Sequence, residues 1–251
     1  MKKFVILAAI MVGALSLSGC IQMHSDTVID KDGSGTASMT LSVSTAVSDA
    51  LVEMKEMDSG QSGDMDFPMF DDINGDELKA AGKDHGVKVT KFEKKVVDER
   101  KTLDIVMEFK DLKGLSYVMG KVMGSEVGDG MGIFDAGDGN FVLRQASYDF
   151  PAEPVEEEEE EVQSEGPAEQ NPEDMQKQMA LMGTLMGSIS ELDVAFKITV
   201  PGDVVSSNAP LVEGNTSIWS INQSNMMSQD QDMEPEIVFS GKGLKIKPLT
   251  E

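Results

Sequence analysis

The sequence predicts an α+β fold, with a mainly antiparallel sheet built from hairpins and helices packed on one face of it. Strand-like segments come in adjacent pairs joined by short turns, which favours hairpins over the strand–helix–strand repeats of a parallel sheet. Segments with apolar residues at helical spacing separate these pairs and are expected to cover one face. A disordered acidic segment is expected to interrupt the fold.

The first hairpin is predicted over residues 23–29 and 36–44, where apolar and polar residues alternate. The stretch 30–35 between them is rich in Asp and Gly, which supply local hydrogen bonds and positive φ angles for a turn. A calcium-binding loop is the alternative interpretation. Leu41 stands at the twelfth position, where such a loop needs a bidentate glutamate, so a hairpin turn fits these residues better.

The other elements follow from the same two periodicities. Helices are predicted where apolar residues recur at helical spacing, the first of them capped by Ser44 or Thr45: 46–57, 75–86, 112–123 and 175–192. Strands are predicted where apolar and polar residues alternate: 87–97, 101–110, 140–150, 194–200, 216–221 and 236–240. Stretches rich in Gly and Asp are predicted to be loops: 59–74 and 124–139.

Residues 151–174 differ in kind from the rest of the chain. They include six consecutive glutamates, Glu156 to Glu161, flanked by prolines. Because these like charges repel one another and cannot be buried, we expect a disordered segment. It divides the body into an N-terminal part, residues 20–150, and a C-terminal part, residues 175–251. The helix and strands of the C-terminal part are expected to complete the same sheet.

Residues 1–19 have the order of a bacterial export signal, with Lys2 and Lys3 ahead of an uncharged apolar run. The run is shorter than the ~20 residues that a membrane-spanning helix needs. It ends in Leu17, Ser18 and Gly19, followed by Cys20, the only cysteine of the chain.

This ending resembles the bacterial lipobox. The resemblance implies diacylation of the Cys20 thiol, cleavage before Cys20 and acylation of the new amino group. Two or three acyl chains anchor a protein stably, so the exported body is expected at the cell membrane or the outer membrane. An ordinary cleaved signal with an incidental cysteine is the alternative.

The net charge of the chain limits the classes of molecule that it is expected to bind. It is −24 for the whole chain and becomes −26 once the two signal lysines are removed. An acidic body is repelled by nucleic acid and by anionic lipid headgroups, so nucleic-acid binding is not expected. The membrane, through the lipid on Cys20, and a lipid or another envelope protein are the expected partners.

No catalytic or metal-binding constellation stands out in the sequence. There is no Gly-x-Ser-x-Gly elbow and no phosphate-binding loop. Neither His24 nor His85 has a cysteine or second histidine at ligand spacing. We therefore predict a protein that is not an enzyme and has no cofactor, metal or catalytic residue.

The chain contains 19 methionines, several of them on one stripe of the helix predicted at 175–192. Core filling by a flexible side chain is the simpler interpretation, and copper binding by thioethers is an alternative. An adaptable apolar groove is the third possibility. Trp219 lies mid-strand and is expected in the core, with a ligand platform as the alternative. The candidate groove residues are Met179, Met182, Met186 and Trp219.

Both ends of the mature chain carry motifs of a known family. At the start, Cys20 is followed by a strand, the turn 32–35, a second strand and a helix. Towards the end come 196–202, 207–209, 213–216 and Trp219. Together, over about half of the chain, these features resemble LppM-type bacterial lipoproteins. The resemblance implies a lipoprotein ectodomain and a role in binding lipid or glycolipid. The acidic segment and a polar stretch at 243–251, in place of a C-terminal membrane helix, depart from the family pattern.

Three hypotheses for function remain. The first is a non-catalytic envelope module that binds a hydrophobic ligand or another envelope protein, with a groove lined by Met, Leu and Val between sheet and helices. The second is a structural or assembly lipoprotein with a packed core and no pocket. The third is a calcium-binding or enzymatic ectodomain that uses acidic loops such as 71–76 and 129–140.

Overall fold

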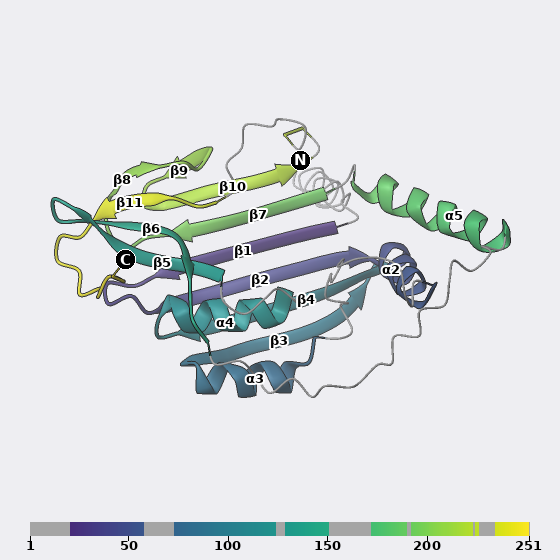
Figure 1. Cartoon of the computed structure of the whole chain (residues 1–251), viewed down its shortest axis with the longest axis horizontal. Helices are drawn as coiled ribbons and strands as arrows, with labels where there is room; N and C mark the ends of the chain where they lie inside the picture. The colour runs from purple at the N-terminus through teal and green to yellow at the C-terminus, as the bar shows by residue number, and fades with distance from the viewer. Residues whose placement is uncertain are drawn as a thin grey trace, which may run out of the picture.

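The computed structural model describes residues 21–57, 73–123, 129–150, 172–189, 192–222, 224–225 and 234–250. Within these ranges the chain forms the expected α+β fold, with two mainly antiparallel sheets (Figure 1). The helices are α2 (Thr45–Met57), α3 (Gly75–Asp84), α4 (Leu112–Met123) and α5 (Pro172–Ile189).

Sheet A has seven strands in the order β3-β4-β2-β1-β7-β10-β9. Their bounds are β1 (Ile21–Ile29), β2 (Gly35–Ser44), β3 (Val87–Val97), β4 (Arg100–Phe109), β7 (Leu192–Thr199), β9 (Leu211–Glu213) and β10 (Thr216–Asn222). Sheet B has four strands in the order β5-β6-β11-β8. Their bounds are β5 (Asp129–Gly137), β6 (Asn140–Ser147), β8 (Val204–Ser207) and β11 (Ile237–Ser240).

Both predicted N-terminal hairpins are confirmed. Strands β1 and β2 pair antiparallel from Ile21 opposite Val43 to Ile29 opposite Gly35, and β3 pairs in the same way with β4. The stretch after β1 is a tight turn, in which Asp30 N donates to Ser34 O at 2.7 Å. The hairpin interpretation of this acidic stretch therefore holds.

Local capping explains where two helices begin. The Ser44 hydroxyl accepts a hydrogen bond from Val47 N at 3.3 Å, so Ser44 rather than Thr45 caps α2. The Asn74 side chain accepts one from Asp76 N at 2.9 Å and caps α3. The chain leaves α3 through Gly86, whose φ of 73° suits a residue without a Cβ.

The C-terminal strands divide between the two sheets. Strand β7 joins sheet A by pairing parallel with β1, the exception to its antiparallel pattern, and β10 and β9 follow it. Strands β8 and β11 instead pair with each other, and β11 pairs with β6 in sheet B. Pro201 and Gly202 turn the chain out of β7, and a Cβ on Gly202 would lie 2.0 Å from Ser240 O. The absent side chain thus lets the two sheets approach.

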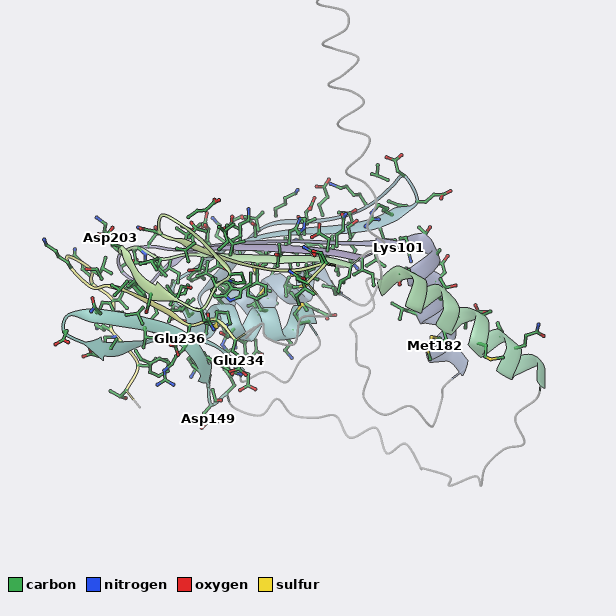
Figure 2. The ribbon with its side chains drawn as sticks, turned by 90° about the horizontal axis from the view of Figure 1, so that it is seen from above. Lys101, Asp149, Met182, Asp203, Glu234 and Glu236 are labelled. Carbon is green, nitrogen blue, oxygen red and sulfur yellow. The ribbon has the colours of Figure 1, made fainter. Side chains whose placement is uncertain are left out.

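The core lies on one side of sheet A. Alternate residues of β2 and β4 are buried there: Ala37, Met39, Leu41, Val43, Leu103, Ile105, Met107 and Phe109. Seen edge-on, sheet A has α4 and sheet B on the same side (Figure 2). The predicted covering of one face by helices is confirmed, and sheet B extends the cover beyond the helices.

Three local predictions need correction. Residues 129–137 form β5 rather than a loop, because Gly130 and Gly132 weaken the strand signal and yet permit close packing. A Cβ on Gly132 would lie 2.8 Å from that of Ala146. Helix α5 begins at Pro172 instead of Met175, as proline suits a first turn. The sequence analysis missed β8 and β9, which have four and three residues. The predicted loop 59–74 up to residue 72, and the acidic segment up to residue 171, lie outside the described residues.

The opposite face of sheet A is polar and centres on Asp104. Its carboxylate accepts hydrogen bonds from Lys95 Nζ at 2.9 Å, Thr40 Oγ1 at 2.9 Å and Lys91 Nζ at 3.1 Å. Burial alone would raise the pKa of Asp104, but these hydrogen bonds outweigh it and hold the pKa below its usual range. The ionised carboxylate therefore stabilises the folded chain at neutral pH.

Asp104→Asn is expected to lower the free energy of unfolding by ~1–2 kcal/mol at pH 7. Because the folded pKa is the lower one, the difference should persist above the unfolded pKa of about 3.9 and fade as the pH falls below it. Urea denaturation across this range measures it. Asp26→Asn, an exposed neighbour on the same face, is the control. Equal effects of the two changes, or a difference that grows in acid, would contradict the prediction.

Candidate functional site

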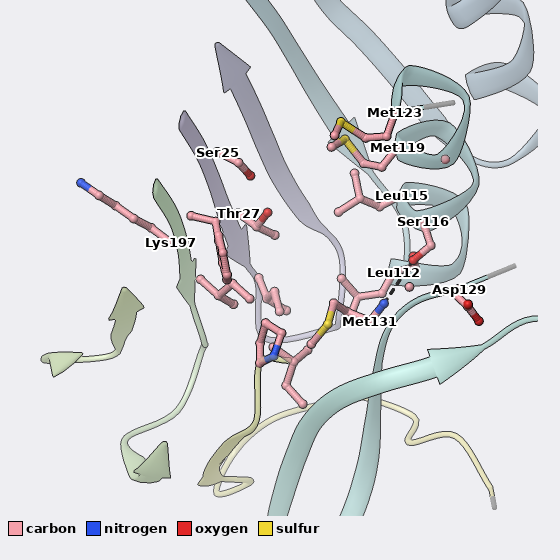
Figure 3. Close-up of a pocket in the computed structure, with 17 residues that line it drawn as sticks. Ser25, Thr27, Leu112, Leu115, Ser116, Met119, Met123, Asp129, Met131 and Lys197 are labelled. Atoms are coloured by element: carbon pink, nitrogen blue, oxygen red, sulfur yellow. Dashed lines mark hydrogen bonds between the residues drawn. The ribbon is translucent and has the colours of Figure 1, made fainter. Parts of the chain in front are cut away.

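An apolar groove lies between α4 and the middle of sheet A, and the start of β5 also lines it (Figure 3). Its volume is about 260 Å³. The residues around it are Ser25, Thr27, Ile29, Leu112, Leu115, Ser116, Met119, Gly120, Met123, Asp129, Gly130, Met131, Leu143, Phe196, Lys197, Ile198 and Pro235.

The floor of the groove is formed by small residues of β1. Ser25 stands in register between Met39 of β2 and Phe196 of β7, and Thr27 stands between Ala37 of β2 and Ile198 of β7. At Ser25, the larger side chains on both sides leave a depression along β1. The floor of the groove therefore depends on the serine that this central strand carries between two large apolar side chains of its neighbours.

Helix α4 forms the wall above this floor. Leu112, Leu115, Met119 and Met123 recur at helical spacing and reach the groove, with the two methionines directed towards β1 in Figure 3. Both methionines are partly exposed, in contrast to the fully buried Val118 and Val122 of the same helix. The flexible thioether side chains can adapt their shape to a bound molecule, so this wall suits apolar ligands of different shapes.

Strand β5 is held against α4 by Ser116. Its hydroxyl donates to Leu112 O at 2.8 Å and accepts a hydrogen bond from Met131 N at 3.3 Å. A Cβ on Gly130 would lie 1.9 Å from the Ser116 Oγ, so glycine is required at this contact. From the other side, the Tyr148 hydroxyl donates to Met131 O at 2.6 Å. Burial, together with the charge of Asp111, raises the pKa of Tyr148 to about 12, so the phenol keeps its proton.

A polar cavity adjoins the apolar groove and shares Asp129 and Pro235 with it. Its volume is about 570 Å³. It is lined by Asp129, Arg144, Gln145, Ala146, Ser147, Asn208, Glu234, Pro235 and Glu236. The Asp129 carboxylate accepts a hydrogen bond from Ser147 Oγ at 3.0 Å, at the junction of the two spaces. An apolar space thus opens beside a polar one.

The structure places Met179, Met182 and Trp219 outside the lining of this groove. Met179 and Met182 lie on α5 with 68% and 46% of their surface exposed, and α5 packs against α2. The side chain of Met186 lies outside the described residues. Trp219 is fully buried, as the core interpretation predicted. Its ring stacks on the groove residue Phe196 at 5.3 Å between centroids, from the neighbouring strand β10.

The methionines that do line the groove are Met119, Met123 and Met131. Met119 and Met123 belong to the predicted helix 112–123, whose apolar stripe a fully packed helix would share, and Met131 falls in the stretch 124–139 that was predicted to be a loop. Ser25 and Thr27 share one face of the predicted strand 23–29 with Met23 and Ile29, so two polar residues interrupt the apolar row. That departure from apolar alternation was the one available signal for the floor.

The two histidines, His24 and His85, contact other side chains of the chain. His85 stacks on Tyr117 at 3.5 Å between ring centroids, and the exposed His24 lies 3.2 Å from Asp193 Oδ2. Within the described ranges, no three His, Cys, Asp or Glu side chains gather closely enough to hold a metal ion. Leu17, Ser18, Gly19 and Cys20 lie outside the described residues. None of the helices in the described part of the chain has the length and apolar character for crossing a membrane.

The fold and site define an α+β protein with an apolar groove between a large, mainly antiparallel sheet and its covering layer. No family model and no curated protein sequence matches the chain. Among solved structures, it is similar to the folded domain of LppM from Mycobacterium tuberculosis, determined by NMR. The two are 11% identical with a TM-score of 0.40, over 89% of this chain and 91% of that one. This is a distant likeness in fold.

Proposed function

We propose that this chain is a membrane-anchored bacterial lipoprotein whose exported body binds a hydrophobic ligand and catalyses no reaction. The anchor is supported by the lipobox-like sequence ending at Cys20. Ligand binding is supported above all by the groove of about 260 Å³ between α4 and β1. Small-molecule pockets typically span ~300–1,000 Å³, so a slender apolar group is the best fit.

The adjoining polar cavity suggests what kind of ligand is bound. An amphiphile could place its apolar part beside Met119 and Met123 and its polar part beside Gln145 and Asn208. The titratable residues around the apolar groove are Asp129 and Lys197, and the Lys197 ammonium points away from it (Figure 3). Such a lining supports holding a ligand rather than transforming it.

Filling the floor of the groove tests this function. Ser25→Leu is expected to weaken binding of the fluorescent apolar probe N-phenyl-1-naphthylamine about tenfold or more, a loss of ~1.4 kcal/mol. The added side chain enters the depression between Met39 and Phe196. Fluorescence titration of the purified protein gives the affinity, and circular dichroism verifies that the fold is kept.

Two matched variants serve as controls. Ser38→Leu adds the same side chain to an exposed position on the opposite face of sheet A and should leave probe binding unchanged. A Met179→Asp and Met182→Asp double variant tests the groove expected from the sequence and should also bind normally. Loss of binding only in the double variant would move the site to α5. Equal binding in all three would refute a ligand site in the groove.

A further inference from the structure

The first described residue marks one end of sheet A. Ile21 is already paired in β1, opposite Val43 of β2 and Leu192 of β7. Val43 in turn pairs with Lys101, and Lys101 with Val96 near the turn of the β3–β4 hairpin. This row of residues, running from β7 to β3, defines the Ile21 end of sheet A.

A lipid on Cys20 would leave no spacer between the membrane and this end. Cys20 directly precedes Ile21, and consecutive Cα atoms lie ~3.8 Å apart. A lipoprotein with a long polar tether can hold its body at a distance from the bilayer, whereas a chain that enters a paired strand at the next residue cannot. The Ile21 end is therefore the part of sheet A nearest the bilayer.

Apolar side chains are exposed at this same end. Val96 and Val97 end β3 with 64% and 51% of their surface exposed. Asp98 and Glu99 close the hairpin with φ angles of 50° and 58°. Both valines are the last residues of β3, and this end of β3 lies on the side where α2 and α5 also lie (Figure 1). The exposed Met179 and Met182 belong to that α5 helix.

The charge of the β3–β4 hairpin differs from that of the body. Residues 87–109 contain six basic and five acidic side chains, a net charge of +1, whereas the whole chain carries −24. The acidic remainder is repelled by an anionic bilayer, and the hairpin is not. Lys91 Nζ and Lys95 Nζ form ion pairs with Asp104 Oδ2 at 3.1 and 2.9 Å, so this carboxylate is paired with basic residues of the same hairpin.

We propose that the Ile21 end of sheet A docks directly on the bilayer surface, with Val96 and Val97 entering the headgroup boundary. The proposal rests on the lipid anchor at Cys20. The anchor supplies the attachment, the valines supply apolar contact, and the hairpin's charge orients the acidic body away from the membrane. The groove between α4 and β1 then has a fixed orientation relative to the bilayer, which a flexible tether would not give it.

Depth-dependent fluorescence quenching tests the docking. The lipidated full chain, carrying Val97→Trp, is reconstituted into vesicles of phosphatidylethanolamine and phosphatidylglycerol with brominated acyl chains. Apolar residues at an interface lie ~5–10 Å into the headgroup boundary, so the added tryptophan should lose about half of its fluorescence. Val96→Trp is a second probe, and the buried Trp219, common to all variants, supplies a constant background.

Val205→Trp is the matched control. Val205 is 60% exposed on β8, which lies at the opposite end of the molecule from the β3–β4 turn (Figure 1). Quenching at positions 96 and 97 but not at 205 supports the docking. Equal quenching at all three positions in a chain that floats with the vesicles overturns the docking and leaves the anchor intact. A chain that does not float with the vesicles overturns both.

Discussion

Cys20→Ser is expected to abolish fatty-acid attachment to this protein completely. Cys20 is the only cysteine in the chain, so no other thiol can accept the lipid. Cells grown with an alkyne-bearing fatty acid should incorporate the label into the wild-type protein and not into the variant. The label is detected after coupling to a fluorophore and gel separation, and mass spectrometry of the mature chain should place its first residue at Cys20.

A conservative lipobox variant separates lipid attachment from general effects on export. Ser18→Ala keeps a small residue before Gly19 and should be labelled like the wild type. The Cys20→Ser protein should appear in the soluble envelope fraction, from which the wild-type protein should be absent. Labelling of Cys20→Ser, or a wild-type chain that carries no label, would disprove the anchor and the docking of the Ile21 end together.

Trp219→Ala should destabilise the fold by ~3–5 kcal/mol, the range for truncating a large core aromatic. Trp219 is fully buried and stacks on Phe196 with an interplanar angle of 12°. Its removal leaves a cavity beside the groove residue Phe196, so probe binding should weaken as well. Urea denaturation followed by circular dichroism measures the loss, because the variant has no tryptophan left to report.

Two variants calibrate that result. Trp219→Phe keeps most of the apolar contact, and the indole Nε1 makes no hydrogen bond within the described structure. The loss of stability should therefore be clearly smaller for Trp219→Phe than for Trp219→Ala. Val205→Ala removes an exposed apolar side chain and should change stability by no more than ~0.5 kcal/mol. If Trp219→Ala were as mild as Val205→Ala, Trp219 could not be a main support of the core.

Periodicity was sufficient for most elements of the fold. Alternation across 36–44 and 101–110 predicted strands that now pair as β2 and β4, with Met39 opposite Ile105 in the buried row. The helix at 112–123 was placed to the residue. The prediction is correct for these segments because one face of each is buried continuously, and the apolar pattern reflects that burial.

Prediction failed where burial follows no local period. Strand β5 contains glycines because it lies against Ser116 and Ala146, and such close contact removes the side chains that would have shown the pattern. The parallel pairing of β1 with β7 joins residues 171 positions apart, such as Ile21 and Leu192. No local signal encodes a contact at that separation.

The sequence by itself was sufficient to predict the fold class, most of the strands and helices, and the burial of Trp219, while the export and lipid-attachment signal stays a prediction. Only the tertiary structure decided where the groove lies. Its two sides, Ser25 and Thr27 on β1 and Met119 and Met123 on α4, are far apart along the chain. Each side taken alone matches an ordinary packed element. The space arises from a mismatch in side-chain size between surfaces that meet only after folding, and sequence periodicity records which face of an element is buried but not how well that face is filled.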